Sequence, residues 1–452
     1  MKKRDPIGRL SPMSGTNLVV VAAVAISLAL TGRAYARTYI DIDAPTIKRM
    51  PIAVTMPIAG PGSNLEDAMF LYRTMTAALD ASGYFSVLNP AMFIEKQGGL
   101  LLGQFNLSDW TDIGAEGLVK MGYGVQGGMV VVKLYTYDVV QGKTLLSKQY
   151  SGGVSDLRYM ANSMVNDVIY AFTGHAGLAG SKIAFVSKKT GTEEIYAMDL
   201  DGSNMVQLTY NKTINLTPVW SPDGTRLLFT SYMQRNPDLY MLDLRDGRTT
   251  TVSRRKGLNI SPSFSPDGSE IAVSLSFRGS PEIYLLDLQG RILKQLTNTS
   301  DINVSPSFSP DGGKIAFVSN RAGGPQIYTM NADGSDVQRI TFNGRYNASC
   351  NWSPSGNRIV FSGLSDDGTF DIYTVAPDGS GLVRLTQNQG DNTSPRWSPD
   401  GYYIIFVSTR DGDQQLYVMN ANGSNQHRLV STKYDMSSPS WSSRINFKIT
   451  IR

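Results

Sequence analysis

One short stretch, Trp220-Ser-Pro-Asp-Gly224, recurs along the second half of the chain and decides the fold. Ser-Pro-Asp-Gly follows an aromatic residue again at Phe264, Phe308 and Trp397, with a Ser-Pro-Ser-Gly copy at Trp352 and a degraded Trp-Ser-Ser copy at Trp441. These aromatic residues lie 44, 44, 44, 45 and 44 residues apart. Proline presets φ and glycine permits a positive φ, so each copy predicts a tight turn at the end of a strand. A fixed period of this length indicates a repeated β architecture.

Each repeat carries further strand patterns between these turns. Apolar runs such as Ile183-Ala-Phe-Val-Ser and alternating runs such as Leu239-Tyr-Met-Leu-Asp recur in all six units. Asp-Gly or Asn-Gly pairs separate the third and fourth strands in five of them. Four short strands in about 44 residues are typical of one propeller blade. We therefore predict an all-β six-bladed propeller over residues 181–452.

The two ends of the repeat region predict how the ring closes. The first unit begins at Ser181 without an aromatic strand of its own, and Ser438–Ser442 is left over at the far end. We expect this C-terminal strand to complete the first blade.

Residues 37–174 lack the repeat and predict an α/β N-terminal domain. Strands are expected at 51–58, 84–88, 129–138 and 144–150. Apolar spacing predicts helices at 65–81 and 158–172, and Ser108 is expected to cap a helix that runs to Met121. Residues 175–180 are glycine-rich and are expected to form a hinge.

The first 36 residues read as a secretory signal peptide. Basic residues precede an uncharged run, Leu18–Leu30, and Ala34-Tyr-Ala36 follows as an A-x-A cleavage site. As a helix the run reaches only about 20 Å, against a bilayer core of about 30 Å. We expect cleavage after Ala36 and no later membrane span.

Composition excludes several functions. The leader holds five basic residues and one acidic residue, which leaves 37 of each sign in the mature chain. A neutral chain is unsuited to binding nucleic acid through bulk charge. One cysteine and two histidines leave little material for a metal site or a catalytic triad. We expect no cofactor, no metal and no enzymatic activity.

Two short motifs invite other readings. Gly122-Tyr-Gly-Val-Gln-Gly127 matches G-x-G-x-x-G, but the expected order is helix before and strand after, the reverse of a dinucleotide site. Asp199–Gly202 resembles the start of a calcium loop, yet lacks the closing glutamate, so a β-turn is the better interpretation.

An asparagine precedes the aromatic strand of five blades by a fixed spacing. The five are Asn215, Asn259, Asn303, Asn347 and Asn392, and the sixth copy has Met436. They are expected to ring one mouth of the central channel. Either each asparagine closes a local turn in its own blade, or the ring binds a partner with help from non-repeating neighbours such as Arg345 and Arg396.

An export signal, a small α/β domain and these repeats together resemble the periplasmic TolB family of the Tol–Pal system. One stretch is similar to the family's junction sequence: it runs from Leu157-Arg-Tyr159 through Asp167 and Phe172-Thr-Gly174 to Lys182-Ile-Ala-Phe-Val186. Asn162 stands where the family usually has histidine, so no role is carried over there.

The resemblance implies a monomeric, non-enzymatic periplasmic adaptor. It implies that a Pal-like outer-membrane lipoprotein binds the propeller and that a TolA-like inner-membrane protein binds the segment after the signal peptide. These contacts would maintain the outer membrane and its constriction at cell division. That segment carries the candidate residues Tyr39, Ile40, Asp41, Ile42 and Asp43, and suits addition to a partner's sheet edge. The alternatives are an ordinary first strand within its own domain and, for the whole protein, an exported propeller hydrolase or lyase or a glycan-binding propeller.

Overall fold

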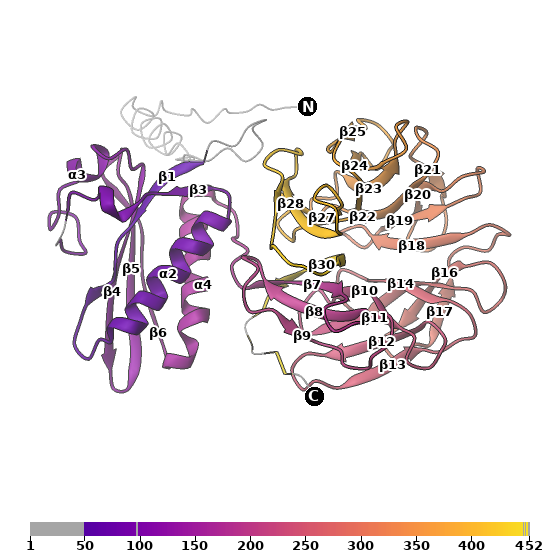
Figure 1. Ribbon diagram of the computed structural model, residues 1–452, viewed down its shortest axis with the longest axis horizontal. Helices are drawn as coiled ribbons and strands as arrows, with labels where there is room; N and C mark the ends of the chain where they lie inside the picture. Colours follow the sequence, from indigo (N-terminus) through magenta and orange to yellow (C-terminus); the bar gives the residue numbers. More distant parts are fainter. Residues whose placement is uncertain (1–48, 96–97, 446, 448, 451–452) are drawn as a thin grey trace, which may run out of the picture. The chain divides into compact units, whose positions relative to one another are not determined.

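A computed structural model describes residues 49–95, 98–445, 447 and 449–450, all of which fall within one compact unit of the chain (Figure 1). The predicted signal peptide, its cleavage site at Ala36 and the candidate segment Tyr39–Asp43 lie outside the described residues.

The first part of the chain builds a mixed sheet with strand order β3-β1-β4-β5-β6. β1 (Met50–Val54) runs parallel to β3 (Phe85–Val87) and to β4 (Gly117–Gln126), and the short β2 (Ile58–Ala59) also pairs with β4. β4, β5 (Met129–Asp138) and β6 (Lys143–Gly152) form an antiparallel meander.

Two long helices accompany this sheet (Figure 1). α2 (Leu65–Ala81) begins at the cap Asn64, whose side chain accepts from the backbone of Glu66, and α4 (Leu157–Thr173) ends at Gly174 with φ of 74°. Their buried faces repeat at helical spacing, which the sequence predicted. Short 3₁₀ turns occupy Pro90–Met92 and Val154–Asp156.

The predicted helix from Ser108 to Met121 is wrong. α3 spans only Ser108–Thr111, and Gly114 at φ of 79° follows it. From Gly117 the chain is the long strand β4, paired with β1 on one side and β5 on the other. Pairing on both edges outweighs the local helical pattern.

The glycine motif at 122–127 therefore lies in β4 and the turn to β5, with no helix on either side. A Cβ on Gly122 would meet Leu100 at 2.8 Å, and one on Gly124 would meet the carbonyl oxygen of Pro61 at 3.1 Å. Close chain packing explains these glycines, and a phosphate site does not.

The rest of the chain forms six four-stranded antiparallel sheets, which confirms the predicted six-bladed propeller. Blade 1 holds β30 (Met436–Arg444), β7 (Ser181–Ser187), β8 (Glu194–Asp199) and β9 (Val206–Gln207). Blade 2 holds β10 (Asn215–Trp220), β11 (Arg226–Ser231), β12 (Asp238–Asp243) and β13 (Thr249–Ser253). Blade 3 holds β14 (Asn259–Phe264), β15 (Glu270–Leu275), β16 (Glu282–Asp287) and β17 (Ile292–Gln295).

The remaining blades repeat this order. Blade 4 holds β18 (Asn303–Phe308), β19 (Lys314–Ser319), β20 (Gln326–Asn331) and β21 (Gln338–Arg339). Blade 5 holds β22 (Asn347–Trp352), β23 (Ile359–Leu364), β24 (Phe370–Val375) and β25 (Val383–Arg384). Blade 6 holds β26 (Asn392–Trp397), β27 (Tyr403–Ser408), β28 (Gln415–Asn420) and β29 (His427–Arg428).

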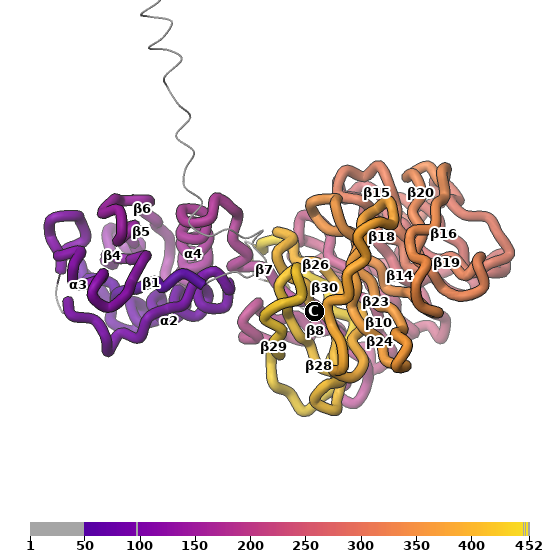
Figure 2. The backbone as a smooth tube through the Cα atoms, turned by 90° about the horizontal axis from the view of Figure 1, so that it is seen from above, coloured from indigo at the N-terminus to yellow at the C-terminus, as the bar shows by residue number. Residues whose placement is uncertain are grey.

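The two ends of the propeller meet in blade 1. β30 pairs antiparallel with β7, with Met436 opposite Ser187 and Trp441 opposite Ile183, and Figure 2 shows it beside β7 and β8. The Trp441 indole N–H donates to Ser181 Oγ at 2.9 Å. The chain ends thus share one sheet, so the ring has no free inner edge.

The propeller core lies between the blades. Each of six buried apolar clusters joins two consecutive blades, and blades 6 and 1 are joined in the same way as the others. The repeated aromatic residue belongs to this packing: Trp220 contributes to the cluster between blades 1 and 2. Removing apolar area from water contributes about 25 cal/mol per Å² to stability, and this burial holds neighbouring blades together.

Candidate functional site

The five repeated asparagines each begin the innermost strand of a blade, and all are at most 3% exposed. Their amide groups bond across to the preceding blade. Asn215 Nδ2 donates to Glu194 Oε2 at 3.0 Å and Asn303 Nδ2 donates to Glu282 Oε2 at 2.9 Å. Asn347 and Asn392 make the same bond to Gln326 and Asp371.

The acceptor of each of these bonds also accepts hydrogen bonds from the segment that follows the fourth strand of its own blade. Thr209 Oγ1 donates to Glu194 Oε2 at 2.5 Å, and the backbone N–H of Lys212 donates to Oε1 at 2.7 Å. Burial raises the pKa of Glu194, and these hydrogen bonds oppose the rise. Three elements from two blades therefore meet at one buried carboxylate.

Asn259 differs from the others. Its Nδ2 donates to the carbonyl oxygens of Pro237, Arg255 and Gly257. It still ties the strand start to the preceding blade. The amide groups of the five asparagines are thus bonded inside the protein, to the preceding blade as well as to the local turn, which is how buried polar groups are satisfied.

The two candidate arginines do not lie together. Arg345 is exposed on the loop just before Asn347. Arg396 lies four residues after Asn392, about 13 Å further along the inner strand, and its Nη1 donates to Pro395 O at 2.8 Å. Arg345 therefore belongs to the asparagine side of the propeller, and Arg396 lies deeper along the channel wall.

The loops beside the asparagines carry exposed apolar side chains that the sequence analysis missed. These loops lead from the fourth strand of one blade to the inner strand of the next. Six of their apolar side chains are 41–69% exposed: Tyr210, Ile214, Ile302, Phe342, Tyr346 and Tyr434. We call these six residues the apolar rim. Ile214, Ile302 and Tyr346 each directly precede a repeated asparagine, and Tyr210 and Phe342 each lie five residues before one. The residue type at these positions varies from blade to blade, so a search for identical repeated residues does not find them.

Charge is unevenly distributed on the same side. Exposed basic residues lie on loops of blades 1, 2 and 3, at the start of blade 5 and after blade 6: Lys188, Lys189, Lys212, Arg235, Arg254, Lys256, Arg278, Arg345 and Lys433. Exposed acidic residues gather on loops of blades 5 and 6: Asp366, Asp367, Asp391, Asp411 and Asp413. Hydrogen bonds from Ser365 and Thr369 hold the pKa of Asp367 well below its usual range, so this carboxylate is ionised at neutral pH.

The opposite side of the propeller is in contact with the α/β domain. The Tyr403 hydroxyl, next to the Ser-Pro-Asp-Gly turn of blade 6, donates to Ser82 O. Tyr402 Oη and His175 Nδ1 are 2.9 Å apart. The inner strand runs from its asparagine to this turn, so the apolar rim lies at the end away from the α/β contact.

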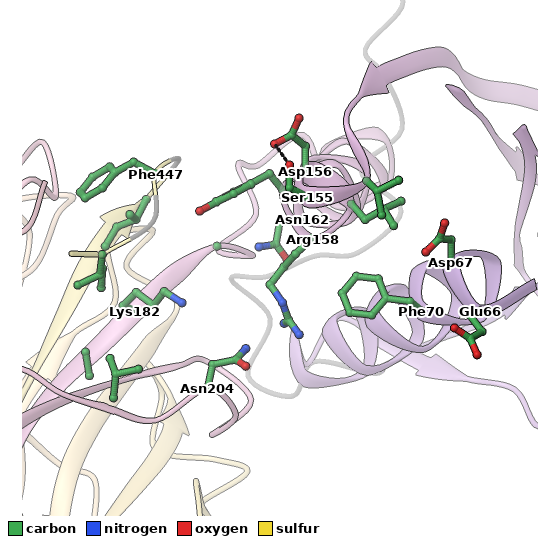
Figure 3. A pocket seen from close by; sticks show the side chains of 18 residues that line it. Glu66, Asp67, Phe70, Ser155, Asp156, Arg158, Asn162, Lys182, Asn204 and Phe447 are labelled. Atoms are coloured by element: carbon green, nitrogen blue, oxygen red, sulfur yellow. Dashed lines mark hydrogen bonds between the residues drawn. The ribbon is translucent and has the colours of Figure 1, made fainter. Parts of the chain in front are cut away.

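A groove of about 950 Å³ runs along this contact (Figure 3). Phe70, Arg158 and Asn162 line it from the helices, and Lys182 and Asn204 line it from blade 1. Asp199 pairs with both Arg158 and Lys182. Arg158 of the predicted junction sequence thus forms an ion pair between the two domains, whereas the Lys182 pair lies within blade 1. Asp167 instead accepts from Lys148 and Tyr150.

The described residues assemble no recognisable reaction centre. Within 49–95, 98–445, 447 and 449–450, no three His, Cys, Asp or Glu side chains are grouped as metal ligands. His175 lies at the α/β contact, whereas His427 is exposed and bonds to Asn425 O. Burial raises the pKa of the Cys350 thiol to about 12, which makes it a poor nucleophile.

No helix within these described residues is both long and apolar enough to cross a bilayer.

These features define a class: a two-domain β-propeller protein with a closed ring and an exposed, partly apolar rim on the side away from its α/β domain. Comparison with known proteins gives the family. The family profile "TolB amino-terminal domain" matches residues 38–145, and "TolB beta propeller domain" matches residues 170–363 and 350–452. The chain belongs to the TolB family, as its sequence motifs predicted.

Similar proteins agree with this assignment. The Tol-Pal system protein TolB of Desulfosudis oleivorans is 38% identical over 190 residues, which cover 41% of this chain and 43% of the relative. That of Geobacter metallireducens is 43% identical over 190 residues, with the same coverage. The chain thus spans less than half the length of these curated relatives.

A solved structure covers more of the molecule. The crystal structure of TolB from Acinetobacter baumannii superposes with a TM-score of 0.76 at 26% identity, over 87% of this chain and 96% of that one. The likeness extends over both the α/β domain and the propeller.

Proposed function

We propose that this chain is a non-enzymatic periplasmic adaptor of the Tol–Pal system. In this proposal a Pal-like lipoprotein of the outer membrane binds the propeller, and a TolA-like protein of the inner membrane binds the segment that follows Ala36. The two contacts serve outer-membrane integrity and constriction at division. Membership of the TolB family supports the system, and the surface of the propeller supports the mode of binding.

The apolar rim is the observation that carries the proposal. Aromatic side chains exposed on loops around a rigid scaffold are the residues that most often anchor protein interfaces. The α/β domain contacts the other end of the inner strands, so it leaves this rim uncovered. We therefore assign the lipoprotein to the asparagine side of the propeller.

The charge distribution on this side of the propeller also favours one orientation of a bound partner. A partner with acidic groups facing blades 2 and 3 and basic groups facing blades 5 and 6 complements Arg235 and Arg278 at one edge and Asp367 and Asp411 at the other. Such a pattern steers encounter and fixes the rotation of the partner about the propeller axis.

Rim substitutions test the lipoprotein site. Phe342→Ser with Tyr346→Ser removes two neighbouring rim anchors, and we expect binding of the purified lipoprotein, measured by calorimetry, to weaken at least about tenfold. Leu293→Ser is the matched control, because Leu293 is comparably exposed but lies on β17, at the outer edge of blade 3. Equal effects of the rim pair and the control contradict the assignment.

Export is tested separately. N-terminal sequencing of the protein recovered from the periplasm should begin at Arg37. An intact leader, or recovery with the cytoplasm, contradicts the proposed location.

A further inference from the structure

The Ser-Pro-Asp-Gly turn is built in the same way in four blades. In each, the serine hydroxyl donates to Oδ1 of the aspartate at 2.5–2.6 Å, and the backbone N–H two residues further on donates to the same oxygen at 3.0–3.1 Å. The four aspartates are Asp223, Asp267, Asp311 and Asp400. Oδ2 differs: hydroxyls of Thr225 and Ser269 donate to Asp223 and Asp267, whereas Gly313 and Tyr402 stand at the matching positions beside Asp311 and Asp400. Asp311 is therefore the local match of Asp400, and the two differ in what covers the turn.

Asp400 is the copy that lies against the α/β domain. It shares a cavity of about 50 Å³ with Ser82, Tyr84 and Tyr403. The Tyr84 ring lies edge-on to Tyr402 and Tyr403, with ring centroids 6.2 and 6.4 Å apart. Asp400 Oδ2 is buried there and has no hydrogen-bond partner among the described residues. One oxygen of this carboxyl is therefore satisfied and the other is not.

The packing of the α/β domain over Asp400 shifts the pKa of its carboxyl in the opposite direction from the exposed copies. Burial raises the pKa of Asp400 to about 6, although hydrogen bonds from Ser398 and from the Tyr402 N–H oppose the rise. In the exposed turn of blade 3, the bond from Ser265 lowers the pKa of Asp267 to about 2. The same bond from Ser309 lowers the pKa of Asp311.

Other titratable and charged groups surround the contact. The α/β domain contributes Tyr84 and the Arg49–Asp80 ion pair, the connecting segment contributes His175, and the propeller contributes Tyr402 and Tyr403. Arg158, Asp199 and Asp201 line the same cavity. Arg158 is already paired with Asp199. No described cation forms an ion pair with Asp400 within 4.0 Å, so nothing neutralises its carboxylate at the contact.

We propose that Asp400 is a proton-operated latch between the α/β domain and the propeller: the domains stay docked while its carboxyl is protonated, and loss of that proton loosens the contact. An ionised carboxylate with a buried, unbonded oxygen is costly. Separation of the domains returns Asp400 to water, where the burial that raises its pKa is lost.

The direction of the pH effect follows from linkage. The docked state holds the proton more tightly, so docking is strongest in acid, weakens as pH rises between about 4 and 6, and levels off above that. A shift of Asp400 from the ordinary 3.8 to about 6 corresponds to a roughly 100-fold change in the docking equilibrium.

Energy transfer between two dyes on the whole mature chain measures the docking. Lys133→Cys on β5 and Lys294→Cys on β17 provide exposed attachment sites, and Cys350 is buried and so escapes labelling. We expect the distribution of interdye distances to lengthen and broaden as pH rises from 4 to 7.5, with a midpoint between 4 and 6. A distribution that does not change with pH overturns the latch.

Three variants assign the transition to Asp400. Asp400→Asn should stay docked at every pH, because its side chain carries no charge. Asp311→Asn, in the matched exposed turn, should keep the wild-type profile, and so should His175→Gln. A transition that persists in Asp400→Asn, or that is lost in His175→Gln, overturns the proposal.

A second measurement stands even if Asp400→Asn fails to fold. Carboxyl resonances of selectively ¹³C-labelled aspartate in the wild-type chain report each group directly. We expect Asp400 to titrate near pH 6, at least two units above Asp267. Titration of both carboxyls in the same range overturns the latch.

Discussion

The amide of Asn303, the first residue of the inner strand of blade 4, donates to the buried carboxylate of Glu282 in blade 3 at 2.9 Å. Thr297 Oγ1 donates to the same carboxylate oxygen. A residue that recurs at the mouth of the channel therefore acts first as a clamp between blades. The asparagine recurs because the contact between neighbouring blades is built in a similar way around the ring. The side chains that distinguish one partner from another lie in the loops beside it.

Removing this clamp should cost stability more than binding. Asn303→Ala leaves the Glu282 carboxylate with one donor fewer in a buried site, which should lower the free energy of unfolding by about 1–3 kcal/mol. Denaturant titration measures this, and Asn298→Ala, at an exposed position in the same loop, is the control. Lipoprotein affinity of the folded variant should stay within about twofold of wild type. A large loss of affinity with unchanged stability would restore the asparagines as contact residues.

Ring closure should be essential for cooperative folding. Deletion of residues 436–452 removes β30 and leaves β7 with an unpaired edge at the channel. We expect calorimetry to show a broad transition or aggregation in place of one sharp peak. The substitution Trp441→Ala is milder: it empties part of the cluster between blades 6 and 1 and should cost about 3–5 kcal/mol. Melting that is unaffected by both changes contradicts the closure.

The α/β domain contains a buried ion pair whose loss should be costly. Lys120 Nζ lies 2.7 Å from Glu95 Oε1, both side chains are under 10% exposed, and the Trp110 indole donates to the other Glu95 oxygen. Glu95→Ala leaves the lysine charge buried and unpaired, so the free energy of unfolding should fall by about 3–5 kcal/mol.

The control for this pair is Lys148→Ala, which breaks the half-exposed pair with Asp167. Water screens that pair, and its loss should cost less than about 1 kcal/mol. Similar losses from the two variants, measured by denaturant unfolding, would contradict the buried character of the Lys120 pair.

The segment after the signal peptide should bind its partner without supporting the fold. Deletion of residues 37–44 is expected to abolish binding to a TolA-like protein, spare the lipoprotein and leave the melting temperature within about 2 °C. Extended residues with alternating side chains suit strand addition to a sheet edge, while ordering them costs roughly 1–2 kcal/mol each. A strongly lowered melting temperature would instead make this segment an ordinary strand of the α/β domain.

The propeller could be predicted because its information is repeated and local. Each copy of the Trp220 motif combines a turn with a strand end, and six copies at one period leave few other architectures. The helices α2 and α4 were predicted for a similar reason, since their buried faces follow helical spacing. The strand β4 was missed because its pairing partners β1 and β5 lie on either side of it in space, and no local pattern records them.

The candidate site was only partly predictable. The sequence located the asparagine side of the propeller, but the burial of Asn215 and its bond to Glu194 depend on contacts between residues 21 positions apart. The apolar rim uses repeat positions whose residue type varies: Phe342 stands where Tyr210 does, but the matching residue in blade 3 is Arg254, so no repeated side chain marks the rim. Asp400 stands in the same Ser-Pro-Asp-Gly motif as Asp311, and the domain packed over Asp400 sets the two apart.

Hydrogen-exchange footprinting of the lipoprotein complex tests the central claim most directly. If the propeller is an adaptor that binds through its apolar rim, amides of residues 210–214, 298–302, 342–346 and 431–435 become protected when the lipoprotein is added. The turns at 222–224 and 266–268, on the opposite side, keep their exchange rates. Protection confined to those turns, or no protection anywhere on the propeller, would contradict the account.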